Sequence, residues 1–503
     1  MRWTNLGDLV DRSARLDSPA IIDLSGEAPR TWTHADIDAL ANGIAIDLTA
    51  RGLPRGAAVA ILSLNRAEYL AAYFGIMRAG FVAVPVNTKL PQETIDFVLR
   101  DAGIVFSFVD TMGRAMIPET MPFLDFDEAG VGGFADVVDP VAEFPTVAMD
   151  LSETAQILYT SGSTGRPKGV LLSHGSQLWP LSTRTSGAQT PNERYIIAQP
   201  LFHMNGLFSA KTIFANNASV VVMPSFDARA YLEALADYEV TAVTAVPTMF
   251  ARLLKNEDLL DSRDYSRLTR IMLGSAPITE ALIEKIQARF PGATMSLGYG
   301  TTEAGPAVFG PHPDGLKTPP TSVGYPLGLD QVRLIDGPGA DEGVLMMRNP
   351  SLMTGYGNLP EKTAEVMRDG WYYSGDVMRR DENGFYYFVG RADDMFVCSG
   401  ENIYPAEVET MLEKHPGIQY AAVVPLADEE RGQVPVAFVV PRPGQAPTEK
   451  DIKSYSLTAG PAYQHPRRIK LLPELPWAGT NKVDRRALIA EANALELQNG
   501  WEG

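Results

Sequence analysis

The chain has 503 residues, well above the length at which one hydrophobic core stops growing, so two or more domains are expected. Its 45% hydrophobic and 21% charged residues are typical of a globular protein and exclude a disordered or fibrous one. A net charge of −18 repels nucleic acid and anionic membranes, so neither is an expected partner.

The first residues lack the apolar core of a secretion signal, and no stretch approaches the roughly 20 apolar residues of a membrane span. We therefore expect a cytoplasmic protein with no membrane span. Cys398 is the single cysteine, which excludes an intramolecular disulfide and a thiolate metal cluster. The six histidines are scattered along the chain, and their spacing does not indicate a zinc site.

Apolar residues recur with helical spacing after Thr33 and predict a capped amphipathic helix that ends before Gly52. An apolar run at 57–62, a helical stretch at 66–78 and a second apolar run at 82–86 then predict a βαβ unit. The same alternation recurs in a strand at 219–223, a helix at 228–238 and a strand at 240–246. The large N-terminal part is therefore expected to be α/β.

Around Gly337 the pattern changes to short strands and turns, which predict a β-rich subdomain. The later elements expected are a helix at 404–414, strands at 420–424 and 436–440, and a last helix from 483. The predicted fold class is thus α/β, with α/β subdomains and a β-rich subdomain in residues 1–392. Residues 393–503 are predicted to form a small, mobile α+β domain.

A run of hydroxyls and glycines from Tyr159 to Gly169 lies between two apolar runs. Glycines let backbone N–H groups converge on an anion, hydroxyls donate to its oxygens, and Arg166 or Lys168 adds positive charge. The run does not match the common P-loop, because Gly165 and Lys168 are not adjacent and strand-like residues follow. It predicts a phosphate site in a different nucleotide fold, the alternative being a flexible surface hairpin. The phosphate-binding candidates are Thr160, Ser161, Gly162, Ser163, Thr164, Gly165 and Lys168.

The motifs that follow this run are Gly274-Ser275-Ala276-Pro277, Tyr299-Gly300-Thr301-Thr302-Glu303, Tyr373-Ser374-Gly375-Asp376, Gly390-Arg391-Ala392-Asp393-Asp394 and the segment Pro476 to Lys482. Their ordered conjunction resembles the adenylate-forming superfamily of acyl-CoA synthetases, peptide-synthetase adenylation domains and luciferases, over nearly the whole chain. The resemblance implies an AMP-forming carboxylate:CoA ligase with ATP and CoA as co-substrates and Mg²⁺ as cofactor.

Joining a carboxylate to the α-phosphorus of ATP brings two anions together, so the site must neutralise charge and align the attacking oxygen. By resemblance, Glu303 binds Mg²⁺, Thr302 contacts the α-phosphate and Asp376 accepts the ribose hydroxyls. Lys482 would bridge the acyl carboxylate and the α-phosphate. The family usually has glycine before this lysine, and Asn481 is the next-best residue at positive φ. The other nucleotide contacts implied are Ser275, Ala276 and Pro277 beside adenine, Tyr299 on its other face, and Gly300, Thr301 and Arg391.

Enzymes of this family use one site for two reactions by rotating the small lobe. Asp393 lies where the family has its hinge. Ser399, Gly400 and Glu401 resemble the loop that lines the pantetheine tunnel, although many relatives have Ser-Gly-Gly where this chain has Cys398 and the two residues after it. Cys398 is expected to be a packing residue, because no nearby histidine activates it.

The segment 200–206 resembles the one that opens the acid pocket, where His203 would lie near the substrate carboxylate and gate the tunnel. Amino-acid-activating relatives usually carry an acid near this point, which argues against an amino-acid substrate. The stretch Thr302 to Ala307 resembles that of coumarate and other aromatic acid ligases, in which glycine and alanine leave room for a flat ring. This resemblance implies an aromatic or medium aliphatic monocarboxylate. The residues expected to line the acid pocket are His203, Met204, Asn205, Gly298, Gly300 and Gly305.

CoA is the expected thiol acceptor, because no carrier-protein segment follows the final helix. One alternative is a stand-alone adenylation enzyme that loads a carrier protein. The other is a catalytically silent nucleotide-binding protein, against which the presence of Lys482, Glu303 and Asp376 argues. The sequence leaves the acid, the pathway and the oligomeric state open, a homodimer included.

Overall fold

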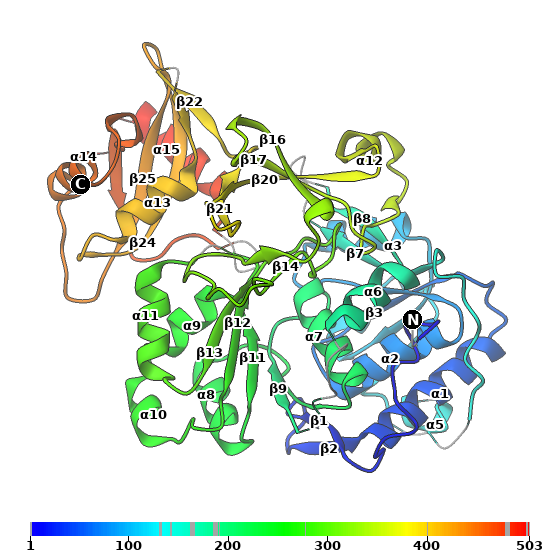
Figure 1. Cartoon of the computed structure of the whole chain (residues 1–503). Coiled ribbons are helices and arrows are strands. Elements are labelled where there is room, and N and C mark those ends of the chain that lie inside the picture. Colours follow the sequence, from blue (N-terminus) through cyan, green and yellow to red (C-terminus); the bar gives the residue numbers. More distant parts are fainter. Residues whose placement is uncertain are drawn as a thin grey trace.

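Parallel strands that alternate with helices form two sheets in the first half of the chain (Figure 1). The computed structural model describes residues 3–129, 133–140, 143–160, 166–184, 190, 192–276, 278–399, 401–477, 483–498 and 501. Within these ranges, one sheet has the order β18-β8-β7-β4-β3-β5-β6. Its strands are β3 (Ala58–Leu62), β4 (Val82–Pro85), β5 (Ile104–Val109), β6 (Phe123–Asp125), β7 (Thr154–Thr160), β8 (Lys168–Ser173) and β18 (Gly355–Tyr356).

The sequence-based expectations for this region are confirmed. Thr33 caps α1 with a reciprocal bond to Asp36, and β3 and β4 pair in parallel across α2 as a βαβ unit. The helices of this part are α1 (His34–Ala50), α2 (Ala67–Arg78), α3 (Gln92–Asp101), α4 (Thr111–Arg114), α5 (Phe134–Val137) and α6 (His174–Arg184).

The second sheet has the order β13-β12-β11-β9-β10-β1-β2 among the described residues. One face packs against α8 to α11, which lie on the left of the sheet in Figure 1, and α7 lies on its other side. The strands are β1 (Pro19–Asp23), β2 (Arg30–Thr33), β9 (Arg194–Ile197), β10 (Ser219–Val222), β11 (Ala242–Ala245), β12 (Arg270–Gly274) and β13 (Thr294–Gly298). The helices are α7 (Met204–Ala215), α8 (Ala228–Asp237), α9 (Pro247–Leu253), α10 (Glu257–Ser262) and α11 (Glu280–Arg289).

The predicted β-rich subdomain follows, with antiparallel pairing along β16-β17-β20-β19 and β21 beside β20. The short strands β14 (Phe309–Gly310) and β15 (Tyr325–Pro326) precede it. Its elements are η1 (Leu329–Gln331), β16 (Val332–Gly339), β17 (Glu342–Met347), α12 (Pro360–Val366), β19 (Met367–Arg368), β20 (Trp371–Arg380) and β21 (Tyr386–Arg391).

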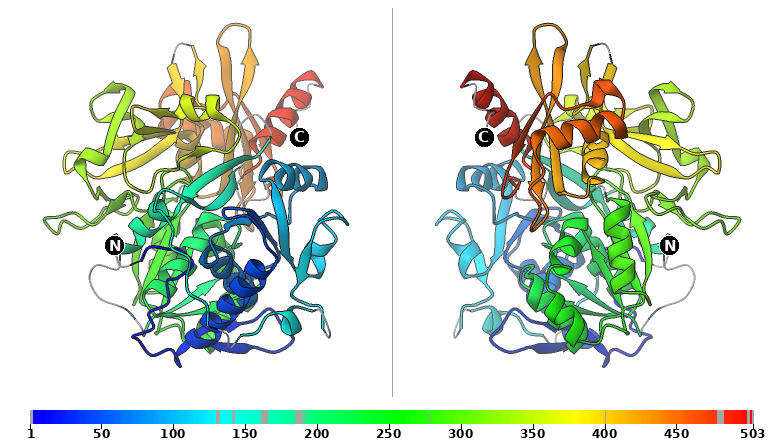
Figure 2. Two further views of the ribbon diagram at one scale, coloured as in Figure 1. Left: turned by 90° about the vertical axis from the view of Figure 1, so that its right-hand side faces the viewer. Right: turned by 90° about the vertical axis from the view of Figure 1, so that its left-hand side faces the viewer.

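A separate hydrophobic core runs from Phe396 to Trp501 and defines the small C-terminal lobe. Figure 2 shows this lobe, in orange and red, above the large domain and beside the β-rich subdomain. The predicted boundary at Asp393 lies just before this core. Within the described ranges, no helix is both long and apolar enough to cross a membrane. The elements of the lobe are β22 (Phe396–Cys398), β23 (Glu401–Ile403), α13 (Pro405–Glu413), β24 (Ile418–Asp428), β25 (Gly432–Pro441), α14 (Glu449–Ala459), η2 (Ala462–Gln464), β26 (Arg468–Leu471) and α15 (Arg485–Leu497).

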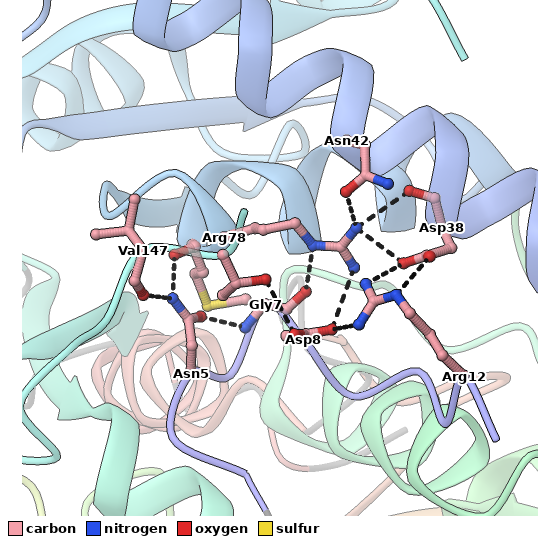
Figure 3. A network of polar contacts seen from close by, with 10 residues as sticks. Asn5, Gly7, Asp8, Arg12, Asp38, Asn42, Arg78 and Val147 are labelled. Atoms are coloured by element: carbon pink, nitrogen blue, oxygen red, sulfur yellow. Dashed lines mark hydrogen bonds and ion pairs between the residues drawn. The ribbon is translucent and has the colours of Figure 1, made fainter. Parts of the chain in front are cut away.

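The N-terminal segment before β1 is held against α1 and α2 by a polar network around Arg78 (Figure 3). The guanidinium of Arg78 is 2.8 Å from the carboxylate of Asp38 and donates to Asn42 Oδ1 at 2.5 Å and to the Gly7 carbonyl at 3.1 Å. Burial lowers the pKa of Arg78, and the nearby Asp38 opposes that shift. Because Leu6 is fully buried beside this network, the segment is part of the large domain's core.

Candidate active site

A cavity of about 4300 Å³ runs between the large domain and the small lobe. The carboxyl ends of β7, β11, β12 and β13 border this cavity. Ligands of parallel sheets commonly bind at the carboxyl ends of the strands. The cavity therefore brings together residues from motifs that are far apart in the sequence. The predicted site residues that line it are Thr160, Lys168, His203, Met204, Asn205, Ser275, Ala276, Gly298, Tyr299, Gly300, Thr301, Thr302, Glu303, Asp376, Arg391 and Asp393.

Some predicted site residues lie outside the described residues, so the structure does not report on them. They are Ser161, Gly162, Ser163, Thr164, Gly165, Pro277, Gly400, Asn481 and Lys482.

The hydroxyl- and glycine-rich run connects two antiparallel strands. Thr160 at the end of β7 pairs with Lys168 at the start of β8, so a strand follows the run, as predicted, and not the helix of a P-loop. The Nζ atom of Lys168 lies 4.4 Å from the ring centroid of Tyr356, whose hydroxyl donates to Glu303 Oε1 at 2.9 Å. Tyr356 therefore connects the base of the predicted phosphate loop to the predicted metal ligand.

Glu303 is presented by a tight turn. The Gly305 N–H donates to the Thr301 carbonyl at 2.9 Å, and the Ala304 N–H donates to Thr301 Oγ1 at 3.0 Å. A side chain on Gly300 would place its Cβ 2.6 Å from the Gly305 carbonyl oxygen, so the turn closes only with glycine there. The closed turn orients the carboxylate of the buried Glu303 toward Tyr356.

Gly305 packs against Ser351 inside the protein and not in the acid pocket, where it was predicted. Its φ is +73°, and an added Cβ would lie 2.6 Å from the Cβ of Ser351. Ala304 and Ala307 are fully buried. These small residues allow close packing inside the protein, whereas the sequence-based expectation was that they make room for the acid. Gly305 accordingly does not line the cavity, although Gly298 and Gly300 do.

The buried carboxylate of Asp376 is fixed by two partners. The Tyr299 hydroxyl donates to Oδ2 at 2.5 Å, and Arg391 Nη1 donates to Oδ1 at 2.7 Å. Burial, with the nearby Asp376, raises the pKa of Tyr299, so the phenol stays protonated as a donor. Burial disfavours the charge of Arg391, but the carboxylates of Asp376 and Asp393 raise its pKa overall. The arrangement is a preorganised acceptor beside a fixed cation.

Arg391 also reaches the predicted hinge. Its Nη2 lies 3.3 Å from Asp393 Oδ2, and the Asp393 side chain is largely exposed. Gly375 has φ +71°, and a Cβ there would lie 3.0 Å from Arg391 Nη2. A glycine at this position therefore lets the guanidinium lie between Asp376 and Asp393.

The predicted entrance to the acid pocket is formed where α7 begins. His203 is the N-cap residue of α7, and its ring packs edge-on against Phe202 with centroids 4.6 Å apart. In the first turn of α7, Asn205 Nδ2 is 3.4 Å from the hydroxyl of Ser275, which follows β12 with φ +66°. Two segments far apart in the sequence thus meet at the mouth of the pocket.

The profile of the AMP-binding enzyme family matches residues 10–357, and that of the AMP-binding enzyme C-terminal domain matches residues 407–482. The chain belongs to the AMP-binding enzyme family. A feruloyl-CoA synthase from Amycolatopsis sp. is 33% identical over 96% of this chain and 98% of its own length. The fatty acid–[acyl-carrier-protein] ligase ScoC from Streptomyces coeruleorubidus is 33% identical over 91% of each chain. The structure of ATP-bound MatB from Rhodopseudomonas palustris superposes with a TM-score of 0.87 at 27% identity, covering 97% of this chain and 98% of MatB.

This AMP-binding enzyme is an AMP-forming carboxylate:CoA ligase. Two of the predicted CoA-facing residues, Ser399 and Glu401, lie away from the cavity walls in this structure. Ser399 has φ +54°, a conformation for which glycine is best suited, and its N–H donates to the Arg431 carbonyl at 3.1 Å. Glu401 is exposed, and neither it nor Ser399 lines the cavity. Cys398 is buried.

Several residues of the enzyme's cleft were not predicted from the sequence. Tyr356 and Tyr372 lie beside Glu303, and burial, with the charge of Glu303, raises the pKa of both phenols. Arg485 makes two bonds to Glu409 on α13, at 2.6 and 2.9 Å, and a third to a carbonyl of β24. Arg485 therefore anchors the start of α15 to the core of the small lobe. The only sequence signal was its place beside the motif that ends at Lys482.

Proposed function

We propose that this ligase activates an aromatic or medium aliphatic monocarboxylate as its acyl-AMP in the cleft and then passes the acyl group to CoA. The observation that carries the proposal is the convergence on one cavity of Lys168, Glu303, Asp376 and Arg391, which come from separate motifs. Together they offer cations for the phosphates and carboxylates for a metal ion and a ribose, as adenylation requires.

The Asp376 carboxylate is proposed to accept the ribose hydroxyls. Each of its oxygens has one bond to the protein and keeps a second acceptor site. Thr302, in the turn before Glu303, is proposed to contact the α-phosphate. Lys482 is proposed to bridge that phosphate and the acid, while His203 at the start of α7 would lie near the attacking carboxylate.

Glu303 is the proposed Mg²⁺ ligand. A carboxylate oxygen suits this hard cation, and the Tyr356 hydroxyl orients the Glu303 carboxylate by donating to its Oε1. Within the described ranges, no group of three or more acidic, histidine or cysteine side chains could hold a metal ion by itself. Mg²⁺ bound here would therefore also need phosphate oxygens of ATP as ligands. It would neutralise part of the negative charge on those oxygens.

Rotation of the small lobe about Asp393 is proposed to separate the two half-reactions, with residues 393–503 as the moving unit. The distinct core from Phe396 to Trp501 supports this division, because it lets the lobe move as one body. Ser399 and Glu401, which lie outside the cavity walls, would face the pantetheine chain after rotation.

A screen of organic acids with ATP, Mg²⁺ and CoA tests the function. We expect acid-dependent AMP release and a thioester of the matching mass for one chemical class of acid. Turnover with a holo-carrier protein but not with CoA would favour a carrier protein as the acceptor. The ScoC relative is a fatty acid–[acyl-carrier-protein] ligase. Absence of acid-dependent AMP release with every acid class would contradict the proposal.

A further inference from the structure

One face of β12 and β13 is open toward the cavity. Ile271 and Leu273 are fully buried against the helices of the other face. Met272, between them in β12, is only half-buried, and Thr294 and Ser296 of β13 are exposed. Strands of a parallel sheet are usually buried on both faces. Because Met272, Thr294 and Ser296 line the cavity, this open face forms the floor of a groove that extends it.

The wall of this groove is a polar stripe along α7 and its C-cap residue, Asn216. Asn205, Ser209, Thr212 and Asn216 follow one another at helical spacing, so they share one side of the helix, and all four line the cavity. Asn216 is 7% exposed, and within the described part of the chain its Oδ1 has no hydrogen-bond partner. A buried acceptor of this kind requires a donor.

The far end of the groove holds an ion pair. Arg270 Nη2 is 2.7 Å from Glu193 Oε2, which also accepts from the Tyr195 hydroxyl at 2.8 Å. Arg270 is the first residue of β12 and Gly274 the last, so the pair lies roughly 13 Å along the strand from the end near the predicted reaction centre. The guanidinium carries five donors, and its charge is balanced by Glu193. This end therefore suits a neutral polar group better than a second carboxylate.

We propose that the groove holds the tail of the acid substrate and that this acid is elongated and carries a hydroxyl at the end distal to its carboxylate. The proposal rests on the proposed function, because it assigns a substrate class to the same site. A plain alkyl tail would cover Asn216 and Ser296 without giving them partners, which is unfavourable. The Thr212 hydroxyl already donates to the Phe208 carbonyl at 2.9 Å. A distal hydroxyl can donate to Glu193 and accept from Arg270.

Matched pairs of acids test this assignment in the full-length enzyme. The pairs are decanoate with 10-hydroxydecanoate and cinnamate with 4-hydroxycinnamate, and decanedioate tests a distal charge. We expect kcat/KM for AMP release to favour the hydroxylated member of at least one pair by about tenfold or more. In Arg270→Met and in Tyr195→Phe this preference should fall severalfold. The ratio within a pair cancels any general loss of activity.

Arg263→Met is the matched control, because Arg263 pairs with Asp237 on the surface and does not line the cavity. It should keep the wild-type preference. Equal use of both members of each pair would overturn the proposal, as would a preference for decanedioate or a preference that persists in both groove variants. If no acid supports AMP release, the proposed function fails instead. Calorimetric measurement of the affinities of the same acids for the wild type and Arg270→Met then tests separately whether the groove prefers the hydroxylated acid.

Discussion

The carboxylate of Asp376 and the guanidinium of Arg391 form a 2.7 Å ion pair in which the carboxylate is almost fully buried and the guanidinium is partly open to the cleft. The second oxygen of Asp376 accepts from Tyr299, so the carboxylate cannot rotate freely. A fixed acceptor needs no reorganisation when a nucleotide binds, so the pair is suited to hold the ribose.

Asp376→Asn should raise KM for ATP by about tenfold to hundredfold, because the amide loses an acceptor and leaves Arg391 with only the more distant, exposed carboxylate of Asp393. The measurement is the ATP dependence of acid-dependent pyrophosphate exchange. Asp341→Asn is the control, since Asp341 pairs with Arg380 on the exposed surface of the same subdomain. An unchanged KM in Asp376→Asn would exclude the ribose role.

Gly375→Ala should also weaken ATP binding, because the new Cβ would lie 3.0 Å from Arg391 Nη2. Gly370→Ala is a close control, since Gly370 has a similar φ of +77° but nothing within 4 Å of an added Cβ. Both variants bear the cost of a side chain at positive φ, about 1 kcal/mol. Only Gly375→Ala should raise KM for ATP, and an equal effect of the two substitutions would show that backbone strain alone is responsible.

The sequence predicted much of the fold because apolar periodicity is a local signal, as in the βαβ unit at 57–86. It did not predict that Tyr356 and Tyr372 lie beside Glu303, because Glu303 comes from a distant segment. No local sequence pattern identifies a tyrosine that will contact a distant carboxylate. The alternation Arg270-Ile271-Met272-Leu273-Gly274 indicates that one face of β12 is less buried than the other. Only the structure shows that this face borders the cavity.

Asp393→Pro tests the proposed hinge. Proline fixes φ, so lobe rotation should be impaired while adenylation in the starting arrangement continues. We expect thioester formation from added acyl-AMP to fall at least about tenfold, with pyrophosphate exchange nearly unchanged. Asp393→Ala removes the contact with Arg391 without fixing φ and is the control. Equal loss of both half-reactions in the proline variant would contradict the hinge assignment.

Lys211 of α7 makes the stability of the enzyme depend on pH. Its side chain is fully buried and donates to Gln177 Oε1 at 2.7 Å. Burial lowers its pKa from the usual 10.5 to about 7. Between these values the unfolded chain binds a proton that the folded chain does not, so this group makes stability rise with pH. Below about pH 7 the cost of burying the charge is complete.

Lys211→Met should therefore be more stable than the wild type near neutral and acid pH, by up to about 5 kcal/mol. The difference should shrink as the pH rises toward 10.5, because above that pH the wild-type lysine is neutral in both the folded and the unfolded chain. Gln177 Oε1 keeps its bond from Gln156 in the variant. Urea unfolding at several pH values measures the effect, and a difference that does not change with pH would disprove it.

Acid-dependent exchange of labelled pyrophosphate into ATP by Lys482→Ala tests whether this lysine drives acyl-adenylate formation. If Lys482 stabilises charge at the α-phosphorus, exchange should fall by about a hundredfold or more, while thioester formation from supplied acyl-AMP and CoA should stay near the wild-type rate. Lys450→Ala, an exposed lysine on α14 of the same lobe, should retain both activities. Exchange at the wild-type rate in Lys482→Ala would exclude a role of Lys482 in adenylation.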